Sequence, residues 1–381
     1  MGLLLLLCFL MQSNIMNKLQ QNIWDTYNFK SLENKCFSIS EVDVSNYSLW
    51  RYHQFLPVDI KGAVTLGEGF TPLLELSFAG KRVFIKQDYL FPTGSYKDRG
   101  ASVLMSYAKQ LGVNSVVQDS SGNAGCSIAA YATYANIKCE IYVPADTSKA
   151  KLAQVAAYGA KLNLVDGDRE DTAEAALVAA NNSYYASHCY NPIFLEGTKT
   201  FAYEVCEQLG WKSPDVVVLP AGNGTLILGC YIGFKHLFES GIITKMPKLV
   251  AIQSQNCAPL FSAWKQGLLA PKIIKPEYTL AEGIAIANPI RGAEMIHAIT
   301  ETKGSFITVS DDEIIDALKV CFKKGFYIEP TSAATIAGLI KAFNETDGEI
   351  WVSLFSGNGL KSTDKIMSIL NNEVIPKVHL K

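Results

Sequence analysis

The stretch SVVQDSSGNAGCSIAAYATYANIKCEIYV, residues 115–143, decides the fold class of this chain. It begins with a β-branched run at 115–118 and passes through a loop of small residues. An alanine-rich segment typical of a helix follows from about 124 to 135, and a second apolar run occupies 141–143. A strand, a helix and a strand of these lengths predict parallel strands joined by a right-handed crossover.

The same alternation continues along the rest of the chain. It predicts helices at 149–158, 171–181 and 311–324, the last opened by a Ser310–Glu313 capping box, and strands at 162–165, 215–219, 249–252 and 351–355. The chain is therefore expected to be an α/β protein with parallel sheets flanked by helices, in two closely packed lobes. Ligands of such sheets bind in the loops at the carboxyl ends of the strands.

Composition excludes several classes of protein. The 381 residues include 34 Lys and Arg against 36 Asp and Glu, a net charge of -2 that argues against nucleic acid as a partner. The nine cysteines contain no C-x-x-C pair, so zinc-ribbon and iron–sulfur spacings are missing and no metal is expected. Their odd number in a long chain argues against a disulfide framework and favours a reducing, cytoplasmic location.

The N-terminus is compositionally different from the rest. Residues 2–11 form an uncharged apolar run, which is too short to span a bilayer. No basic residue precedes it and no small-x-small cleavage site follows, so we interpret residues 1–16 as an extension with a start assigned too early, and Met16 as the favoured start. An export signal is the less favoured alternative.

Three loops that follow predicted strands are rich in small residues. They are Ser120–Gly125, Ala221–Thr225 and Ser356–Gly359. A strand, a glycine loop and a helix N-terminus together favour bound phosphate. The second loop does not match a dinucleotide fingerprint, because Gly229 falls five residues after Gly224 instead of three, and no Gly-Lys-Ser/Thr is present. A compact phosphate cofactor fits these loops better than a nucleotide.

The segment Pro92–Gly100, PTGSYKDRG, places Lys97 after a turn at the start of a predicted helix. A helix N-terminus disfavours positive charge and so helps to keep an amine neutral and nucleophilic. A single lysine is more often simply solvated. Whether Lys97 has a functional role therefore depends on the motifs that accompany it in the sequence.

Those motifs resemble the threonine synthase family of fold-type II pyridoxal-phosphate enzymes, whose fold is tryptophan synthase beta-like. The resemblance covers roughly residues 45–370 and includes, in order, LWRY at 49–52, LGEGFTPL at 66–73, PTGSYKDRG at 92–100, EPTSAA at 329–334 and SGNGLK at 356–361. It implies a large cofactor domain made of residues 17–99 and 196–381, and a small domain, 100–195, that closes over the substrate.

The resemblance also implies a role for each matching residue. Lys97 would hold pyridoxal 5'-phosphate as a Schiff base and act as the catalytic base, and Asn123 would bond the ring hydroxyl. The phosphate would be held by Gly222, Asn223, Gly224 and Thr225, and Ser356 would face the pyridine nitrogen. A hydroxyl there does not enforce protonation of that nitrogen, which predicts a weaker electron sink suited to elimination and replacement.

The substrate segment departs from the family pattern Asn-Ser-x-Asn-Pro-x-Arg-x-x-Gly. Phe194 replaces the Arg, and His188 and Cys189 replace the Asn-Ser pair. Losing a guanidinium removes a bidentate partner for a phosphate dianion. These departures argue against phosphohomoserine and favour a less charged side chain. The residues assigned to substrate are Ser121, Gly122, His188, Cys189, Phe194 and Asn288.

Three functions remain open from the sequence. The first is a carbon–oxygen lyase of the threonine-synthase type in amino-acid biosynthesis. The second is a serine/threonine dehydratase-like or cysteine-synthase-like enzyme that eliminates or replaces a β substituent. The third is a non-catalytic pyridoxal-phosphate binder, which the intact Lys97 argues against. The expected partner is an amino-acid substrate, and no association with a membrane is expected. The resemblance leaves open whether the protein forms a homodimer.

Overall fold

The computed structural model describes residues 35–147, 149–167 and 169–371, which form two compact units that interleave along the sequence. The first unit contains the described residues up to Phe70, together with Lys97–Glu204 and Leu228–Ile242. The second contains Thr71–Tyr96, Val205–Ile227 and the described residues from Ile243 onwards. The extension expected at residues 1–16 lies outside the described residues.

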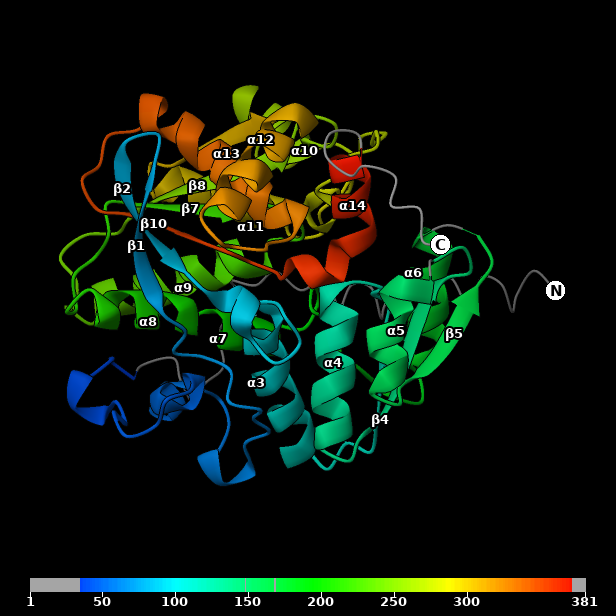
Figure 1. The fold of residues 1–381 in the computed structure, drawn as a ribbon. Coiled ribbons are helices and arrows are strands. Elements are labelled where there is room, and N and C mark those ends of the chain that lie inside the picture. Colours follow the sequence, from blue (N-terminus) through cyan, green and yellow to red (C-terminus); the bar gives the residue numbers. More distant parts are fainter. Residues whose placement is uncertain (1–34, 148, 168, 372–381) are drawn as a thin grey trace, which may run out of the picture. The chain divides into compact units, whose positions relative to one another are not determined.

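A four-stranded sheet with the order β5-β4-β3-β6 forms the centre of the first unit, and all its pairings are parallel. Its strands are β3 (Ser115–Gln118), β4 (Lys138–Pro144), β5 (Lys161–Val165) and β6 (Tyr184–Tyr185). The crossover helices are α4 (Asn123–Tyr134), α5 (Lys149–Ala157) and α6 (Arg169–Ala179). Helices α4 and α6 both contact β3 and β4, as the sequence pattern predicts (Figure 1).

The first unit also contains α3 (Lys97–Gln110), which contacts α4 and α7 (Ile193–Thr198). Leu104 and Met105 of α3 share one buried cluster with Ile128 of α4 and Ile141 of β4. Short 3-10 helices precede α3, namely η1 (Ile39–Glu41), η2 (Leu49–Phe55) and η3 (Ile60–Gly62). Helices α8 (Thr200–Gln208) and α9 (Thr225–Glu239) each have residues in both units.

A six-stranded sheet with the order β1-β2-β10-β7-β8-β9 forms the centre of the second unit. The β1–β2 pair is antiparallel, and the other pairs are parallel. The strands are β1 (Leu73–Phe78), β2 (Lys81–Lys86), β7 (Val216–Pro220), β8 (Lys248–Ser254), β9 (Ser305–Val309) and β10 (Trp351–Leu354). All of β7 is buried, as expected for a central parallel strand covered on both faces. The hairpin β1–β2 and strand β9 were not predicted from the sequence.

The helices of the second unit are α10 (Pro259–Lys265), α11 (Gly292–Glu301), α12 (Asp311–Lys323), α13 (Pro330–Glu345) and α14 (Thr363–Asn371), with η4 (Asp88–Leu90), η5 (Glu282–Ile284) and η6 (Gly359–Ser362). Helix α13 contacts β7, β8, β9 and β10. The predicted capping box of α12 is confirmed, since Ser310 Oγ accepts from the Glu313 amide at 3.2 Å and Glu313 Oε2 accepts from the Ser310 amide at 2.8 Å.

These elements confirm the predicted α/β class. The predicted small domain, 100–195, lies inside the first unit, which extends well beyond it, and the domain boundaries stay a prediction.

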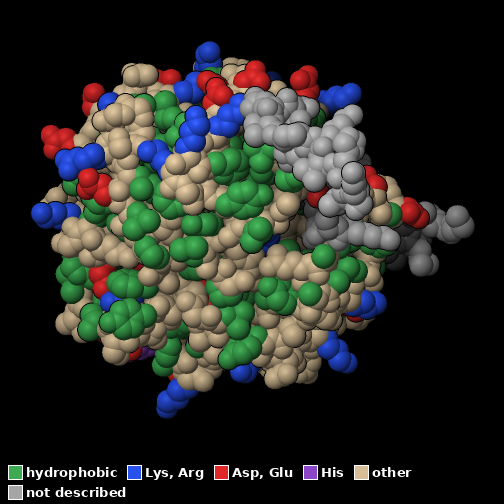
Figure 2. All heavy atoms as spheres, in the orientation of Figure 1, with side chains coloured by type: hydrophobic (Ala, Val, Ile, Leu, Met, Phe, Trp, Pro, Cys, Tyr) green, Lys and Arg blue, Asp and Glu red, His purple; other side chains and the backbone are tan. Residues whose placement is uncertain are grey.

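The cysteines of the described part are all free thiols, as expected. None of the described helices is both long enough and apolar enough to cross a bilayer. The face drawn in Figure 2 carries acidic and basic side chains next to each other, in keeping with the small net charge.

Candidate active site

The loops after β7 and β10 carry most of the residues that the sequence assigns to the cofactor. Because β7 and β10 are parallel neighbours in the six-stranded sheet, their carboxyl ends meet at one edge. The first loop runs from Ala221 to Gly224 and leads directly into α9 at Thr225. The first amides of a helix have no acceptor within the helix, so the start of α9 provides donors to an anion at this edge.

Gly224 shows why this loop needs glycine. Its φ is +86°, and a Cβ added there would lie 2.6 Å from the sulfur of Met295 on α11. A side chain at Gly224 would therefore be strained by its backbone and would also collide with the next element. Position 224 of the loop after β7 therefore requires glycine.

Tyr96 joins the two loops. Its hydroxyl lies 3.0 Å from Thr225 Oγ1 at the start of α9, and its amide donates to the Ser356 carbonyl at 3.0 Å. Ser95 forms a bridge with Gly357 on the same loop. Lys97 follows Tyr96 directly and is the first residue of α3, so the predicted lysine is tethered by one peptide bond to a residue held by both loops.

Ser356 belongs to a buried polar cluster with Ser332 and Glu329. Ser356 Oγ lies 3.0 Å from Ser332 Oγ and donates to Glu329 Oε1 at 3.2 Å. Ser332 is in the first turn of α13, and Glu329 is the N-cap residue of that helix. A Cβ on Gly357 would lie 2.2 Å from the Glu329 carboxyl carbon, so the carboxylate reaches Ser356 only because position 357 is glycine.

The residues present fit a pyridoxal-phosphate group. The cradle before α9 provides backbone donors for a phosphate, and the Ser356 hydroxyl provides a partner for a heterocyclic nitrogen. A further polar atom is available, because the hydroxyl of Ser95 is buried and has no hydrogen-bond partner among the described residues. An orphaned buried hydroxyl is costly in a structure without a ligand, which supports a polar group binding at this edge.

In the first unit, the loop after β3 leads into α4 at Asn123. Gly122 is exposed, and Ser121 and Asn123 are half-buried, so the loop and the start of α4 are accessible. Ser127, one turn into α4, donates to Asp98 Oδ1 at 2.7 Å. Because Asp98 follows Lys97, this bond holds the first turn of α4 next to the first turn of α3. The predicted Lys97 and Asn123 therefore occupy the starts of two helices that are bonded to each other.

His188 and Cys189 lie in the turn after β6, beside the loop that follows β3. Both are buried, and Cys189 Sγ lies 3.2 Å from His188 Nε2. Gln118 Nε2, at the end of β3, lies 3.5 Å from His188 Nδ1. These two neighbours form a turn, which lets their side chains meet.

Phe194 is fully buried on α7, with its ring edge-on to His188 at 6.0 Å between centroids. The ring also packs against Gly100 of α3, so closely that a Cβ there would lie 2.3 Å away. Phe194 is therefore part of the core of the first unit. Asn288 is exposed on the loop between η5 and α11. The substrate roles of these residues stay predictions.

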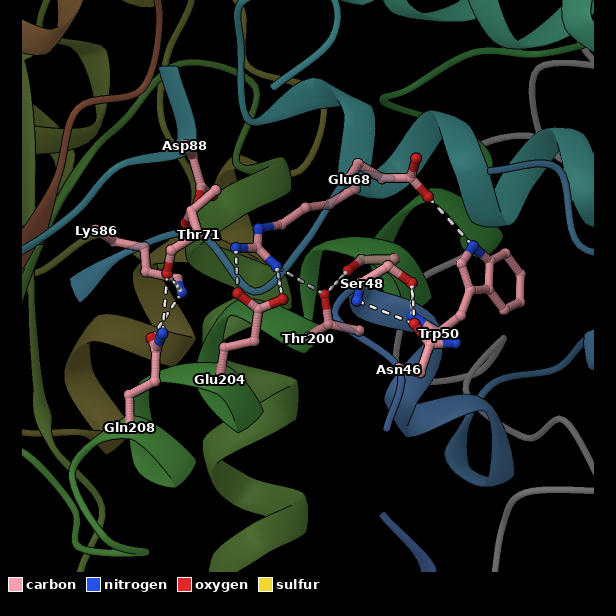
Figure 3. A network of polar contacts seen from close by, with 12 residues as sticks. Asn46, Ser48, Trp50, Glu68, Thr71, Lys86, Asp88, Thr200, Glu204 and Gln208 are labelled. Carbon is pink, nitrogen blue, oxygen red and sulfur yellow. Dashed lines mark hydrogen bonds and ion pairs between the residues drawn. The ribbon is translucent and has the colours of Figure 1, made fainter. Parts of the chain in front are cut away.

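A buried ion pair and a buried glutamate support the start of α3 and the segment that precedes it in the first unit (Figure 3). The guanidinium of Arg99 binds both carboxylate oxygens of Glu204, at 2.7 and 2.8 Å, and neither side chain is exposed. Glu68 accepts from the indole of Trp50 at 3.2 Å and from the Tyr131 hydroxyl of α4 at 2.7 Å. Burial raises the pKa of Glu68, against the lowering effect of its hydrogen bonds with Ser102, Tyr131 and the Leu66 amide.

The sequence motifs contained four of these residues without assigning them a role: Ser95, Tyr96, Glu329 and Ser332. Ser95 and Tyr96 directly precede the lysine, and Glu329 and Ser332 sit in the block EPTSAA. Position within a motif was the only signal available for them. Their partners lie in distant segments, so the hydrogen bonds themselves could not be predicted.

Comparisons with known proteins identify the family of this chain. The model of the family described as pyridoxal-phosphate dependent enzyme matches residues 64–357. The chain is 36% identical over 350 residues to a threonine synthase of Methanocaldococcus jannaschii, covering 89% of this chain and 86% of the relative. It is also 36% identical over 325 residues to a threonine synthase of Mycobacterium bovis, covering 82% of this chain and 88% of the relative.

Solved structures give the same fold. A fungal L-serine ammonia-lyase from Rhizomucor miehei superposes with a TM-score of 0.71 at 20% identity, covering 82% of this chain and all of that chain. Maize serine racemase superposes with a TM-score of 0.66 at 20% identity, covering 79% and 92%. At these identities the likeness concerns the fold, and it confirms the predicted fold-type II class.

Proposed function

This chain belongs to the family of pyridoxal-phosphate dependent enzymes, and we propose that within it the chain eliminates or replaces a group on the side chain of an amino acid, as a carbon–oxygen lyase of the threonine-synthase type. It is an enzyme of amino-acid metabolism with pyridoxal 5'-phosphate as cofactor, and a lyase. The observation that carries the proposal is the attachment of Tyr96, the residue before Lys97, to both Thr225 and Ser356.

Each group of residues has a separate task in the proposal. Lys97 would hold the cofactor, and its amine would be the base for the α-proton of the substrate. The cradle from Gly222 to Thr225 binds the phosphate, Ser356 faces the ring nitrogen and Asn123 bonds the ring hydroxyl. Amides at the start of α4, around Ser121 and Gly122, receive the substrate carboxylate. The bound cofactor would delocalise the negative charge left on the substrate carbon.

The proposed substrate carries no phosphate on its side chain. Support comes from the turn after β6, where His188 and Cys189 bond to each other and Phe194 lies in the core behind them. None of these three side chains carries a fixed positive charge, and a phosphate dianion is recognised best by a guanidinium. This favours serine, threonine or an activated serine, which is the dehydratase-like or cysteine-synthase-like alternative.

The cofactor assignment is tested by visible absorbance of the purified protein. The wild type should be yellow with bound cofactor, and Lys97→Ala should lose that band. Lys109→Ala, at an exposed lysine on the same helix, is the matched control and should keep it. A band that survives in Lys97→Ala would contradict the assignment of the lysine.

The substrate is tested by incubating the enzyme with phosphohomoserine, serine, threonine and O-acetylserine. We expect keto-acid release or thiol incorporation from the hydroxyl or acetylated amino acids, and little phosphate from phosphohomoserine. Efficient phosphate release would overturn the substrate proposal and support a true threonine synthase. A reducing, cytoplasmic location and a homodimer are part of the proposal, the former supported by the free thiols.

A further inference from the structure

The first turn of α3, which begins with Lys97, is held by the side chains of the next two residues. The first amides of a helix have no acceptor within the helix, and helix ends fray. The direction in which the Lys97 side chain leaves the helix therefore depends on how the rest of the turn is fixed. Asp98 and Arg99, which follow Lys97, are both fully buried.

Asp98 and Arg99 fix the turn from two directions. Asp98 Oδ1 accepts from Ser127 of α4 at 2.7 Å, whereas the Arg99 guanidinium binds Glu204 of α8. Successive residues of an α-helix are about 100° apart around its axis. A rotation of the first turn would therefore break at least one of the two bonds, and the pair of bonds determines where Lys97 points.

The bond to α8 is the more directional of the two. Arg99 Nη1 and Nη2 donate to Glu204 Oε1 and Oε2 at 2.7 and 2.8 Å, and Nη1 also donates to Thr200 Oγ1 at 3.1 Å (Figure 3). A guanidinium and a carboxylate joined by two parallel bonds are fixed in orientation as well as in distance. Both side chains are fully buried, so no water competes for these bonds.

The backbones of α3 and α7 meet directly beside this ion pair. A Cβ on Gly197 would lie 2.0 Å from the carbonyl oxygen of Arg99. Thr200 Oγ1 donates in turn to the Gly197 carbonyl at 2.7 Å, so the residue that supports the guanidinium is itself held by α7. The end of α7 and the start of α8 thus form a fixed support for the first turn of α3.

We infer that Glu204 is a positioning residue, which acts through Arg99 to aim the amine of Lys97 at the aldehyde of the cofactor. This inference rests on the proposed function, in which Lys97 holds pyridoxal 5'-phosphate. A buried ion pair is a poor source of net stability, because removing both charges from water costs about as much as their attraction returns. What the two parallel bonds do supply is orientation, and they supply it two residues from the lysine.

The experiment compares two ligands that share a ring and a phosphate. Pyridoxal 5'-phosphate carries the aldehyde that bonds to an amine, and pyridoxine 5'-phosphate carries an alcohol there and cannot. Calorimetric titration of the cofactor-free protein gives both dissociation constants, and their ratio isolates the contribution of the lysine. Lys97→Ala should remove the preference for the aldehyde and so sets the lower limit of the ratio.

Glu204→Gln should lower the preference for the aldehyde by about tenfold and leave the affinity for the alcohol unchanged. The amide places a donor against the guanidinium, so the two parallel bonds cannot both remain. It also leaves the Arg99 charge buried without a carboxylate, which threatens folding. Arg99→Met combined with Glu204→Leu removes both charges, keeps the site filled, and should reduce the preference in the same way, because an apolar contact is not directional.

The matched control is a second buried ion pair of the first unit. Lys199 Nζ binds Glu196 Oε2 at 2.5 Å, and this pair joins α7 to the residue that precedes α8 and not to α3. Glu196→Leu combined with Lys199→Met should leave the preference for the aldehyde at the wild-type value, whatever it does to stability in urea.

A wild-type preference in the Arg99→Met, Glu204→Leu variant would overturn the inference, and so would an equal loss of affinity for both ligands. Both outcomes would leave the proposed function intact. A wild-type chain with no preference for the aldehyde would instead contradict the assignment of Lys97 in the proposed function, and the inference with it.

Discussion

The hydroxyl of Tyr96 lies 3.0 Å from Thr225 Oγ1, across 129 residues of sequence, and this bond attaches the residue before Lys97 to the start of α9. The amide of Tyr96 donates to the Ser356 carbonyl, so the same residue is also bonded to the loop after β10. One side chain and one amide thus hold Tyr96 against the two loops at the edge of the six-stranded sheet.

Tyr96→Phe should weaken cofactor binding without unfolding the protein. The change removes one hydrogen bond and leaves the ring in place, so we expect about a three- to tenfold rise in the dissociation constant for pyridoxal phosphate. The measurement is a titration of the cofactor-free protein followed by absorbance. Tyr47→Phe, at an exposed tyrosine, is the matched control, and equal constants for wild type and Tyr96→Phe would contradict the role.

Gly224→Ala should abolish most phosphate binding and also destabilise the fold. The added Cβ meets Met295 at 2.6 Å, and the φ of +86° disfavours any side chain. Gly241→Ala measures the cost of a side chain at positive φ alone, because Gly241 has a φ of +73° and nothing lies within 4 Å of its Cβ position. We expect Gly224→Ala to cost about 1–3 kcal/mol more than Gly241→Ala in urea unfolding, through overpacking. Equal losses would show that the collision with Met295 relaxes freely.

Glu68→Gln should destabilise the first unit. The carboxylate accepts bonds from Trp50, from Tyr131 and from the Leu66 amide, and an amide group would place its own donor against one of them. A buried donor without an acceptor costs about 1–3 kcal/mol, which urea unfolding would detect. Glu75→Gln, at an exposed glutamate, should leave the midpoint unchanged. Unchanged stability in Glu68→Gln would show that the neutral side chain is accommodated.

His236 should make the fold sensitive to mild acid. Burial, with the nearby Lys199 charge, lowers its pKa from 6.5 to about 4, while its bond to the Lys35 carbonyl acts in the opposite direction. Between those values the unfolded chain takes up a proton that the folded chain refuses, so stability falls as the pH drops from about 6.5 to 4.

The decrease in the free energy of unfolding that His236 causes amounts to at most about 3 kcal/mol. His236→Gln should flatten this part of the pH profile of unfolding, since its oxygen can still accept from Tyr203 and its amide can still donate to Lys35. His297→Gln, at an exposed histidine on α11, should leave the profile as it is in the wild type. A His236→Gln profile as steep as that of the wild type would contradict the assignment.

Short sequence patterns predicted the strands and helix caps that depend on neighbouring residues. The β-branched run at 215–219 became β7 within one residue, and the Ser310–Glu313 box did cap α12. The hairpin β1–β2 and strand β9 were missed because half-buried strands of five or six residues have a weak periodic signal. The contact between His188 and Cys189 could not be predicted, because it depends on the turn that contains them.

The sequence by itself determined the class of fold, because β-branched runs form strands. It also predicted the glycine cradle and Lys97, the cradle because glycine permits positive φ and the lysine because the motifs around it resemble those of a pyridoxal-phosphate family. Only the tertiary structure decided which loops meet and which residues bond to each other. The bond from Ser356 to Glu329 joins residues 27 apart, and the bond from Tyr96 to Thr225 joins residues 129 apart. Hydrogen bonds depend on distances of about 3 Å between atoms, and only packing of the sheets and helices brings such distant residues that close.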